Sequence, residues 1–277
     1  METKLATFEN MTLYVGIDIH KRQWHVSIFT ASIHHRTFSQ PPEPLALKHY
    51  IDQHFPGAKV ICAYEVTKFG FWISRALIDF GYQCLVVNPA DIPSTSVESS
   101  NKSDSMDSRK IARTLQAGLL QGVHVASLQT SGDRHLFRYR KRLWSDLVRT
   151  KNRIKDKFLF YGITIPPQWD NPYWSKAFLR WVAEVEMPSA SVRLTLDLLL
   201  EQYHLIYRHF LKTSVQVRKL LRTARYKEQG KLLRTIPGIG PLTAVQLLVE
   251  LEDINRFTSF KKLNSYVGFR PTTHSSG

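Results

Sequence analysis

The sequence lacks any hydrophobic run long enough to cross a bilayer, and its start, Met1–Lys4, has neither the basic nor the apolar segment of a signal peptide. Its two cysteines, Cys62 and Cys84, fall in expected strands, which indicates buried, reduced thiols and a cytoplasmic protein. The eleven histidines show no zinc-ligand spacing. These absences argue against a membrane protein, a disulfide-stapled secreted domain and a structural zinc module.

The charge is distributed unevenly along the 277 residues, which are enough for one large domain or two smaller ones. Hydrophobic residues make up 43% of the chain, as in an ordinary globular protein, and the net charge is +15. Residues 1–120 carry a net charge of +1 and residues 121–277 carry +14. We therefore expect a nucleic acid to bind the second half, the alternative being a basic surface that only aids solubility.

Hydrophobic periodicity in the first 125 residues predicts an α/β domain. The expected strands lie at 12–18, 23–29, 36–38, 59–65 and 82–87, and the expected helices at about 45–54, 71–78 and 104–116. The resulting order is three antiparallel strands followed by strands reached through helices. This order is the ribonuclease-H-like arrangement, although the composition alone permits other α/β folds.

Four carboxylates stand at particular points of this pattern. Asp18 and Glu65 each end a buried strand, while Asp104 and Asp107 begin a helix and share one of its faces. Acids in a first helical turn also simply favour the helix dipole. Four nearby carboxylates repel one another unless a cation joins them, and Mg²⁺ prefers oxygen ligands. The four acids together therefore predict a magnesium site.

The second region, 126–225, lacks strand patterns and predicts two long helices at 134–157 and about 190–224. Their apolar stripes are typical of a coiled coil, serving as a core or as a dimer seam. The first helix holds ten Lys/Arg and two Asp. We predict phosphate contacts there, against the alternative of a solvated helix face, for Arg138, Arg140, Lys141, Arg142, Arg149, Lys151, Arg153 and Lys155.

The third region, 226–277, contains a glycine-rich turn at 236–244 between two helical patterns. It resembles the hairpin of helix-hairpin-helix DNA-binding modules. Gly238 and Gly240 would let backbone N–H groups approach a phosphate at the start of the next helix. The alternative is a tight turn between packed helices. The expected domains are thus 1–125, 126–225 and 226–277, the last two helical.

Several sequence blocks, in this order, resemble the DEDD transposases of the insertion-sequence 110 family. They are Tyr14–Lys21, Tyr64–Glu65, Asn88–Pro89, Lys102–Ala112, Thr235–Gly240, Phe260–Pro271 and His274–Gly277. The resemblance implies a RuvC-like first domain and a C-terminal transposase domain. It also implies a recombinase that excises and inserts a mobile element, with a bridge RNA pairing to donor and target DNA. We expect a dimer or tetramer, because strand exchange requires several strands to be cut together.

The same resemblance implies that Asp18, Glu65, Asp104 and Asp107 bind Mg²⁺ and that a serine attacks DNA phosphate. The matching serine is Ser276, with Ser275 adjacent. Family members continue past this Ser-Gly, so we expect a shortened member of the family. Two alternatives stay open: a Mg²⁺ endonuclease like a Holliday-junction resolvase, and a non-catalytic nucleic-acid-binding remnant.

Overall fold

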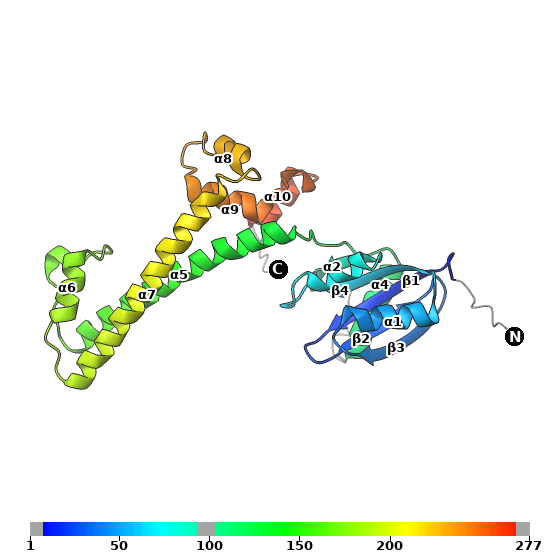
Figure 1. Ribbon diagram of the computed structural model, residues 1–277, viewed down its shortest axis with the longest axis horizontal. Helices are drawn as coiled ribbons and strands as arrows, with labels where there is room; N and C mark the ends of the chain where they lie inside the picture. The colour runs from blue at the N-terminus through cyan, green and yellow to red at the C-terminus, as the bar shows by residue number, and fades with distance from the viewer. Residues whose placement is uncertain (1–7, 93–103, 270–277) are drawn as a thin grey trace, which may run out of the picture. The chain divides into compact units, whose positions relative to one another are not determined.

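The computed structural model of the chain describes residues 8–92 and 104–269, without the side chains of Asp104 and Ser105 (Figure 1). The chain forms two compact units, the first ending at Val125 and the second beginning at Ala126. The further division of the second unit at residue 225 stays a prediction. No helix in the described part of the chain has both the length and the hydrophobicity needed to span a membrane.

The first unit is built on a mixed sheet. Its strands are β1 (Thr12–Ile19), β2 (Trp24–Phe29), β3 (His34–Gln40), β4 (Lys59–Glu65) and β5 (Gln83–Val87). Among the described residues their order across the sheet is β3-β2-β1-β4-β5. The first three strands pair antiparallel, whereas β4 runs parallel to β1 and β5 runs parallel to β4. The two parallel pairs require crossovers, which helices supply.

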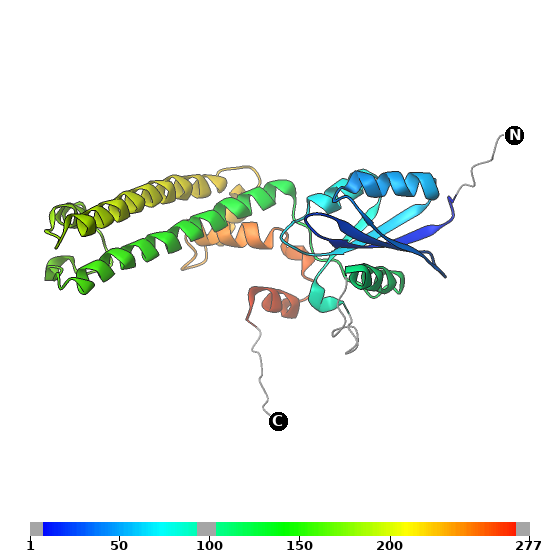
Figure 2. The same cartoon turned by 90° about the horizontal axis from the view of Figure 1, so that it is seen from below.

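Helices cover both faces of the sheet (Figure 2). They are α1 (Pro44–His54), α2 (Trp72–Asp79), the short 3₁₀ helix η1 (Pro89–Asp91) and α4 (Asp104–Gln116). Because side chains alternate along a strand, β1 buries Val15 and Ile17 against α1 and α2. Ile111 and Leu115 of α4 pack on the opposite face, against Ala63. The sheet therefore has two cores, and α4 alone of these helices contributes to the second.

Local sequence features set the ends of these elements. Pro44 occupies the first turn of α1, where its missing N–H costs no hydrogen bond. Gly81 follows α2 with a φ of 87°, a left-handed conformation that favours glycine. The predicted α/β class of the first unit and its β-β-β-α-β-α-β-α order are confirmed. The finer ribonuclease-H-like assignment stays a proposal.

The second unit is helical, as predicted. Two long helices, α5 (Leu128–Phe160) and α7 (Ala190–Leu220), pack side by side and run in opposite directions (Figure 1). The connection between them contains η2 (Pro167–Trp169) and α6 (Lys176–Glu184), a helix that the sequence patterns missed. The chain then continues through α8 (Lys227–Leu233), α9 (Pro241–Leu251), η3 (Ile254–Arg256) and α10 (Phe260–Val267).

Each end of the α5–α7 pair has its own core. At one end, Ile154 and Phe158 of α5 meet Phe178 of α6 and Leu196 of α7. At the other end, α5 and α7 pack against α9 in a cluster that is centred on Val217. Buried residues of α7 thus recur at the spacing of a coiled-coil seam, which supports the predicted coiled-coil character of the pair.

A second apolar stripe on α7 faces solvent. Leu194, Leu198 and Leu205 are 60%, 55% and 47% exposed, and the stripe continues through the exposed Leu211 and Val215. The seam to α5 uses different positions, because the residues buried there include Leu196, Leu200, Tyr203 and Val217. Of the two roles predicted for an apolar stripe on this helix, core or dimer seam, this stripe therefore does not serve as the core of the unit.

Candidate functional site

The carboxylates of Asp18 and Glu65 belong to neighbouring strands. In the parallel β1–β4 ladder Ile17 pairs with Tyr64, so the next step of the register brings Asp18 beside Glu65. Partners in a parallel ladder point to the same face, with the strands about 4.8 Å apart. Asp18 Oδ2 lies 3.0 Å from His20 Nε2, and the Asp18 side chain keeps 20% exposure. Two of the predicted acids therefore lie side by side at the C-terminal ends of the neighbouring strands β1 and β4. We call this end of the sheet the acidic edge.

The helix α4 approaches this face unusually closely at Gly16. A Cβ atom at Gly16 would lie 2.2 Å from the Ser108 carbonyl oxygen and 2.4 Å from the Ala112 nitrogen. Beside this contact the hydroxyls of Ser27 and Ser108 are 2.9 Å apart and buried. Gly16 and Asp18 are two residues apart on β1, so they share a face. The absence of a side chain at Gly16 thus positions α4 over the strand that carries Asp18.

The direction of α4 places its first turn at the acidic edge. Its middle lies at Gly16 through Ser108, while at its end Gln116 Nε2 donates to the carbonyl oxygen of Thr30, 2.5 Å away. Thr30 follows β2, beside the start of β1. The helix therefore runs antiparallel to β1, and its N-terminus lies near the C-terminal end of that strand. Asp107 stands there, one residue before Ser108.

The described side chains do not complete a metal site. Among the described residues, no group of three or more His, Cys, Asp or Glu side chains is arranged to hold a metal ion. The fourth predicted acid, Asp104, begins α4, but its side chain lies outside the described residues. Ser275 and Ser276 also lie outside them. The fold thus gathers Asp18, Glu65 and the start of α4 at one edge, and the four-acid metal site stays a prediction.

The predicted phosphate-binding cations all lie on α5, where several contact their own unit. Arg138 donates to both carboxylate oxygens of Glu250, at 2.8 and 2.6 Å. Arg140 donates to Ser214 Oγ at 2.8 Å. Lys151 donates to the Pro172 carbonyl oxygen at 3.1 Å, and Lys155 pairs with Asp170 at 3.1 Å. Arg149 pairs with Asp146 one turn away.

These contacts change the charge available to a ligand. Burial lowers the pKa of Lys151, and the nearby Lys155 lowers it further. The hydrogen bond to Glu250 raises the pKa of Arg138. Lys141, Arg142 and Arg153 are exposed and make no ion pair within the described chain. These three carry the least compensated charge of the predicted set.

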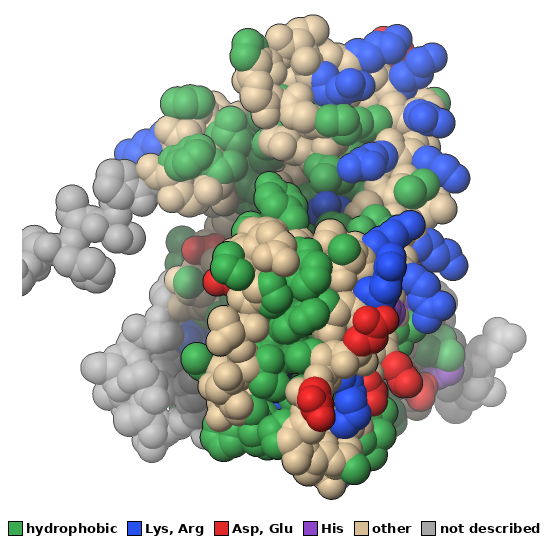
Figure 3. All heavy atoms as spheres, turned by 90° about the vertical axis from the view of Figure 1, so that its left-hand side faces the viewer, with side chains coloured by type: hydrophobic (Ala, Val, Ile, Leu, Met, Phe, Trp, Pro, Cys, Tyr) green, Lys and Arg blue, Asp and Glu red, His purple; other side chains and the backbone are tan. Residues whose placement is uncertain are grey.

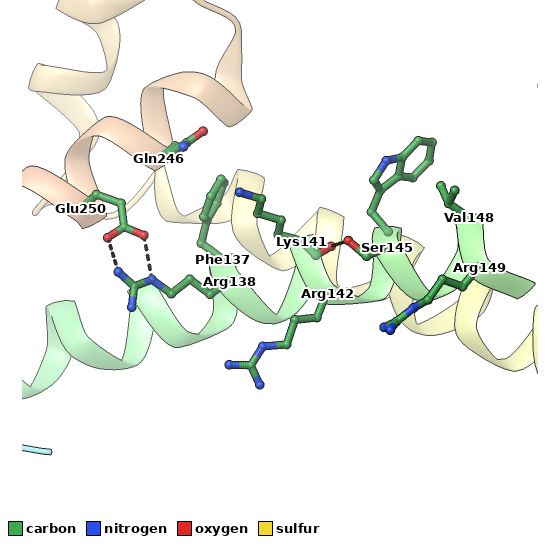
Figure 4. A pocket seen from close by; sticks show the side chains of 10 residues that line it. Phe137, Arg138, Lys141, Arg142, Ser145, Val148, Arg149, Gln246 and Glu250 are labelled. Atoms are coloured by element: carbon green, nitrogen blue, oxygen red, sulfur yellow. Dashed lines mark hydrogen bonds and ion pairs between the residues drawn. The ribbon is translucent and has the colours of Figure 1, made fainter. Parts of the chain in front are cut away.

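The cations of α5 border a hollow against α9 (Figure 4). Its volume is about 1020 Å³, and it is lined by Phe137, Arg138, Lys141, Arg142, Trp144, Ser145, Val148, Arg149, Gln246 and Glu250. Figure 4 shows Arg142 and Arg149 extending from the same side of α5. Figure 3, which views the second unit from the end that carries α6, shows lysine and arginine side chains gathered along one side. The residues that line the hollow thus include four of the predicted cations, Arg138, Lys141, Arg142 and Arg149.

The predicted glycine hairpin is present between α8 and α9. Ile239 N donates to the Ile236 carbonyl oxygen at 3.1 Å, closing a turn in which Gly238 has a φ of 87°. Gly240 caps α9, and Pro241 occupies its first turn. A Cβ atom at either glycine would meet nothing within 4 Å. The backbone of the hairpin is therefore open to an approaching group.

Sequence reasoning missed three features of these sites. Gly16 and Ser108 lie in different predicted elements, and nothing in the pattern indicates that they touch. Glu250 reads as an ordinary helical acid, although it fixes Arg138. Trp144 fits the apolar periodicity of α5 but is 52% exposed. Only the contact at Gly16 has a signal in the sequence, because a glycine within a strand often marks a close approach of another backbone.

Comparison with known proteins finds transposases. Residues 15–162 match the model of a family described as "Transposase", the DEDD type of IS110, and residues 230–277 match that of the "Transposase IS116/IS110/IS902 family". The transposase for insertion sequence element IS1533 of Leptospira borgpetersenii is 22% identical over 246 residues, which are 87% of this chain and 70% of that protein. The transposase for IS1328 of Yersinia enterocolitica is 24% identical over 97% of this chain and 76% of its own length.

Other alignments cover a smaller share of the related protein. A pilin gene-inverting protein of Moraxella bovis is 46% identical over 55 residues, which are 20% of this chain and 17% of that protein. Two further transposases are matched over 52% and 48% of their lengths. The chain thus spans about half to three quarters of the length of these four transposases.

Proposed function

Since this chain belongs to the IS110 family of transposases, we propose that it is a recombinase that cuts and rejoins DNA strands of a mobile element. One observation carries the proposal: Asp18 and Glu65 lie side by side on parallel strands, at the edge where α4 begins with Asp104 and Asp107. The strand order, with three antiparallel strands and two parallel ones reached through helices, supports a RuvC-like domain around this edge.

The chemistry of the edge fits Mg²⁺. Asp18, Glu65, Asp104 and Asp107 would hold the ion, since carboxylate oxygens are the ligands that it prefers. When bound, Mg²⁺ neutralises charge on a phosphate and favours deprotonation of an attacking hydroxyl. The protein's own contribution is to keep several carboxylates close enough to share a cation.

We assign the nucleophile to a serine, as the family resemblance implies. Ser276 is the first candidate and Ser275 the second. The hydroxyl loses its proton, its oxygen forms a bond to DNA phosphorus, and the bond from phosphorus to one deoxyribose oxygen breaks. That oxygen leaves with a proton, and its later attack on the phosphoserine restores the serine. Serine is a weak nucleophile at neutral pH, so it requires such activation.

Two nucleic acids are the proposed partners: DNA, as donor and target, and a non-coding bridge RNA that pairs with both. Base pairing would carry the sequence information, which leaves the protein to bind backbone and shape. The exposed Lys141, Arg142 and Arg153 and the open hairpin at Gly238 and Gly240 support this division.

We also propose a homo-oligomer. The exposed stripe of α7 that contains Leu194, Leu198 and Leu205 supports this proposal, because contiguous apolar surface on a helix is usually covered by a partner. A second copy of the chain is the partner that the chemistry requires, since strand exchange needs more than one cleavage at once.

The serine step is tested by trapping the covalent intermediate on labelled DNA with Mg²⁺ and the copurifying RNA. We expect a protein–DNA adduct in the wild type and in Ser275→Ala, and none in Ser276→Ala or Asp18→Asn. An adduct that persists in Ser276→Ala contradicts the assignment of the nucleophile. Mg²⁺-dependent cleavage without any adduct favours the resolvase-like endonuclease, and binding without cleavage in any divalent metal favours a non-catalytic protein.

A further inference from the structure

Two hollows along α5 meet at Trp144. The hollow against α9 shares Trp144 and Val148 with a second hollow of about 420 Å³, which extends to Lys151, Lys155 and Trp174. We call these two hollows together the Trp144 groove. From Arg138 to Lys155 it covers about 26 Å of helix axis. This length accommodates several nucleotides of an extended strand.

The Trp144 groove is positively charged along its whole length. Six cations line it, Arg138, Lys141, Arg142, Arg149, Lys151 and Lys155, against two carboxylates. Both carboxylates, Glu250 and Asp170, are already paired with lining cations. An anionic ligand would therefore meet no uncompensated negative charge among the lining residues.

Trp144 presents an aromatic surface in the middle of this charge. Its ring lies 5.5 Å from that of Phe210 on α7, at 40°, and the residue remains 52% exposed. The guanidinium of Arg140 stands 4.7 Å from the Phe210 ring on which Trp144 leans. The indole is thus braced by the α5–α7 pair instead of swinging freely, so less side-chain entropy is lost when a ligand stacks on it.

We propose that the Trp144 groove binds an unpaired stretch of nucleic acid, with one base stacked on Trp144 and a flanking phosphate held by Lys141, which extends from the same side of α5 (Figure 4). The inference rests on the proposed function, since it specifies which form of nucleic acid this basic face accepts. Charge alone would suit duplex and single strand equally. An indole in the middle of the groove favours a single strand, because bases in a duplex stack on one another and leave no face free.

The experiment measures binding of the full chain to oligonucleotides of about twelve nucleotides, a length within known single-strand site sizes. The probes are single-stranded RNA, single-stranded DNA and a DNA duplex. The variants are Trp144→Ala, Trp144→Phe and the control Trp72→Ala. Trp72 is 49% exposed, close to the exposure of Trp144, but lies on α2 of the first unit. Circular dichroism checks that each variant is folded.

We expect Trp144→Ala to weaken the affinity for single strands by about fivefold to a hundredfold. This loss corresponds to the usual stacking free energy of one base on an aromatic side chain. Trp144→Phe should restore most of it, while Trp72→Ala and duplex binding change less than about twofold. The tighter of the two single-stranded probes identifies RNA or DNA as the source of the strand. Quenching of tryptophan fluorescence by the probe should shrink in Trp144→Phe and persist in Trp72→Ala.

Three results would overturn the inference. Equal single-strand affinity in the wild type and Trp144→Ala removes the stacking contact but leaves the proposed recombinase intact. Equal weakening of single-strand and duplex binding by Trp144→Ala shows that Trp144 has a structural role on α5 and does not stack on a base. A wild-type chain that binds none of the probes contradicts the proposed function itself as well as this site.

Discussion

Replacing Gly16 with alanine tests the close contact between β1 and α4. The added Cβ would lie 2.2 and 2.4 Å from two backbone atoms of α4, and backbone cannot rotate away as a side chain does. The helix would have to retreat by about 1 Å, and overpacking of this kind costs about 1–3 kcal/mol. Separation of Ser27 from Ser108 adds about 1 kcal/mol, because Ser27 keeps its bond to Thr37.

We therefore expect Gly16→Ala to destabilise the first unit by about 2–4 kcal/mol. Since two units need not unfold together, the measurement is hydrogen exchange of peptides that cover β1 and α4, which reports local opening. Gly122→Ala is the matched control in the same unit, because its Cβ would meet Leu85 atoms at an ordinary 3.6 Å or more. Unchanged protection of both peptides in Gly16→Ala would refute the reasoning.

Three further predictions concern other parts of the chain. Leu198→Glu should lower the oligomeric state in light scattering without changing the helix content, and an unchanged mass would reject the α7 stripe as the seam. The double variant Lys141→Gln, Arg142→Gln should lower the slope of log binding constant against log salt concentration by the amount expected for about two lost phosphate contacts. An unaltered slope places these cations away from the ligand. Burial raises the pKa of the Cys84 thiol from 9.0 to about 11. The folded state therefore keeps a proton that the unfolded chain loses, and the free energy of unfolding should fall between pH 9 and 11. Cys84→Ala should flatten this fall in chemical denaturation, and an identical pH profile would contradict the shift.

The sequence was a good guide to the elements of the first unit, because their patterns are local. Strand 59–65 was predicted at its observed bounds, and α4 at 104–116. Alternating hydrophobicity and a stopping glycine after α2 are visible within a few residues. The parallel pairing that brings Asp18 beside Glu65 was less accessible, since it depends on a crossover through α1 and not on either strand alone.

The long helices show a different limit. α7 carries two apolar stripes, one at Leu196, Leu200 and Tyr203 and another at Leu194 and Leu198. Both have helical spacing, so periodicity predicts the helix but cannot say which stripe meets α5. The choice follows from the shape and charge of the partner helix. For the same reason Trp144 was predicted on α5 without any indication of its exposure.

Charge counting also has a limit, because it assigns cations without their partners. Arg138 and Lys155 contribute to the basic excess of the second half, yet each is held by a carboxylate of its own unit. Glu250 comes from a segment 112 residues after Arg138, and Asp170 lies in the connection that follows α5, 15 residues after Lys155. The sequence therefore identified the basic helix correctly but not which of its charges remain available.

The contact of Gly16 with Ser108 also constrains how the protein is made. A chain emerging from the ribosome completes β1 early, but the helix that closes the acidic edge emerges only after both parallel strands. Until then, the face of β1 that carries Gly16 and Asp18 has no cover from α4. A nascent chain therefore lacks the packing of α4 on β1 until nearly all of the first unit has been synthesised.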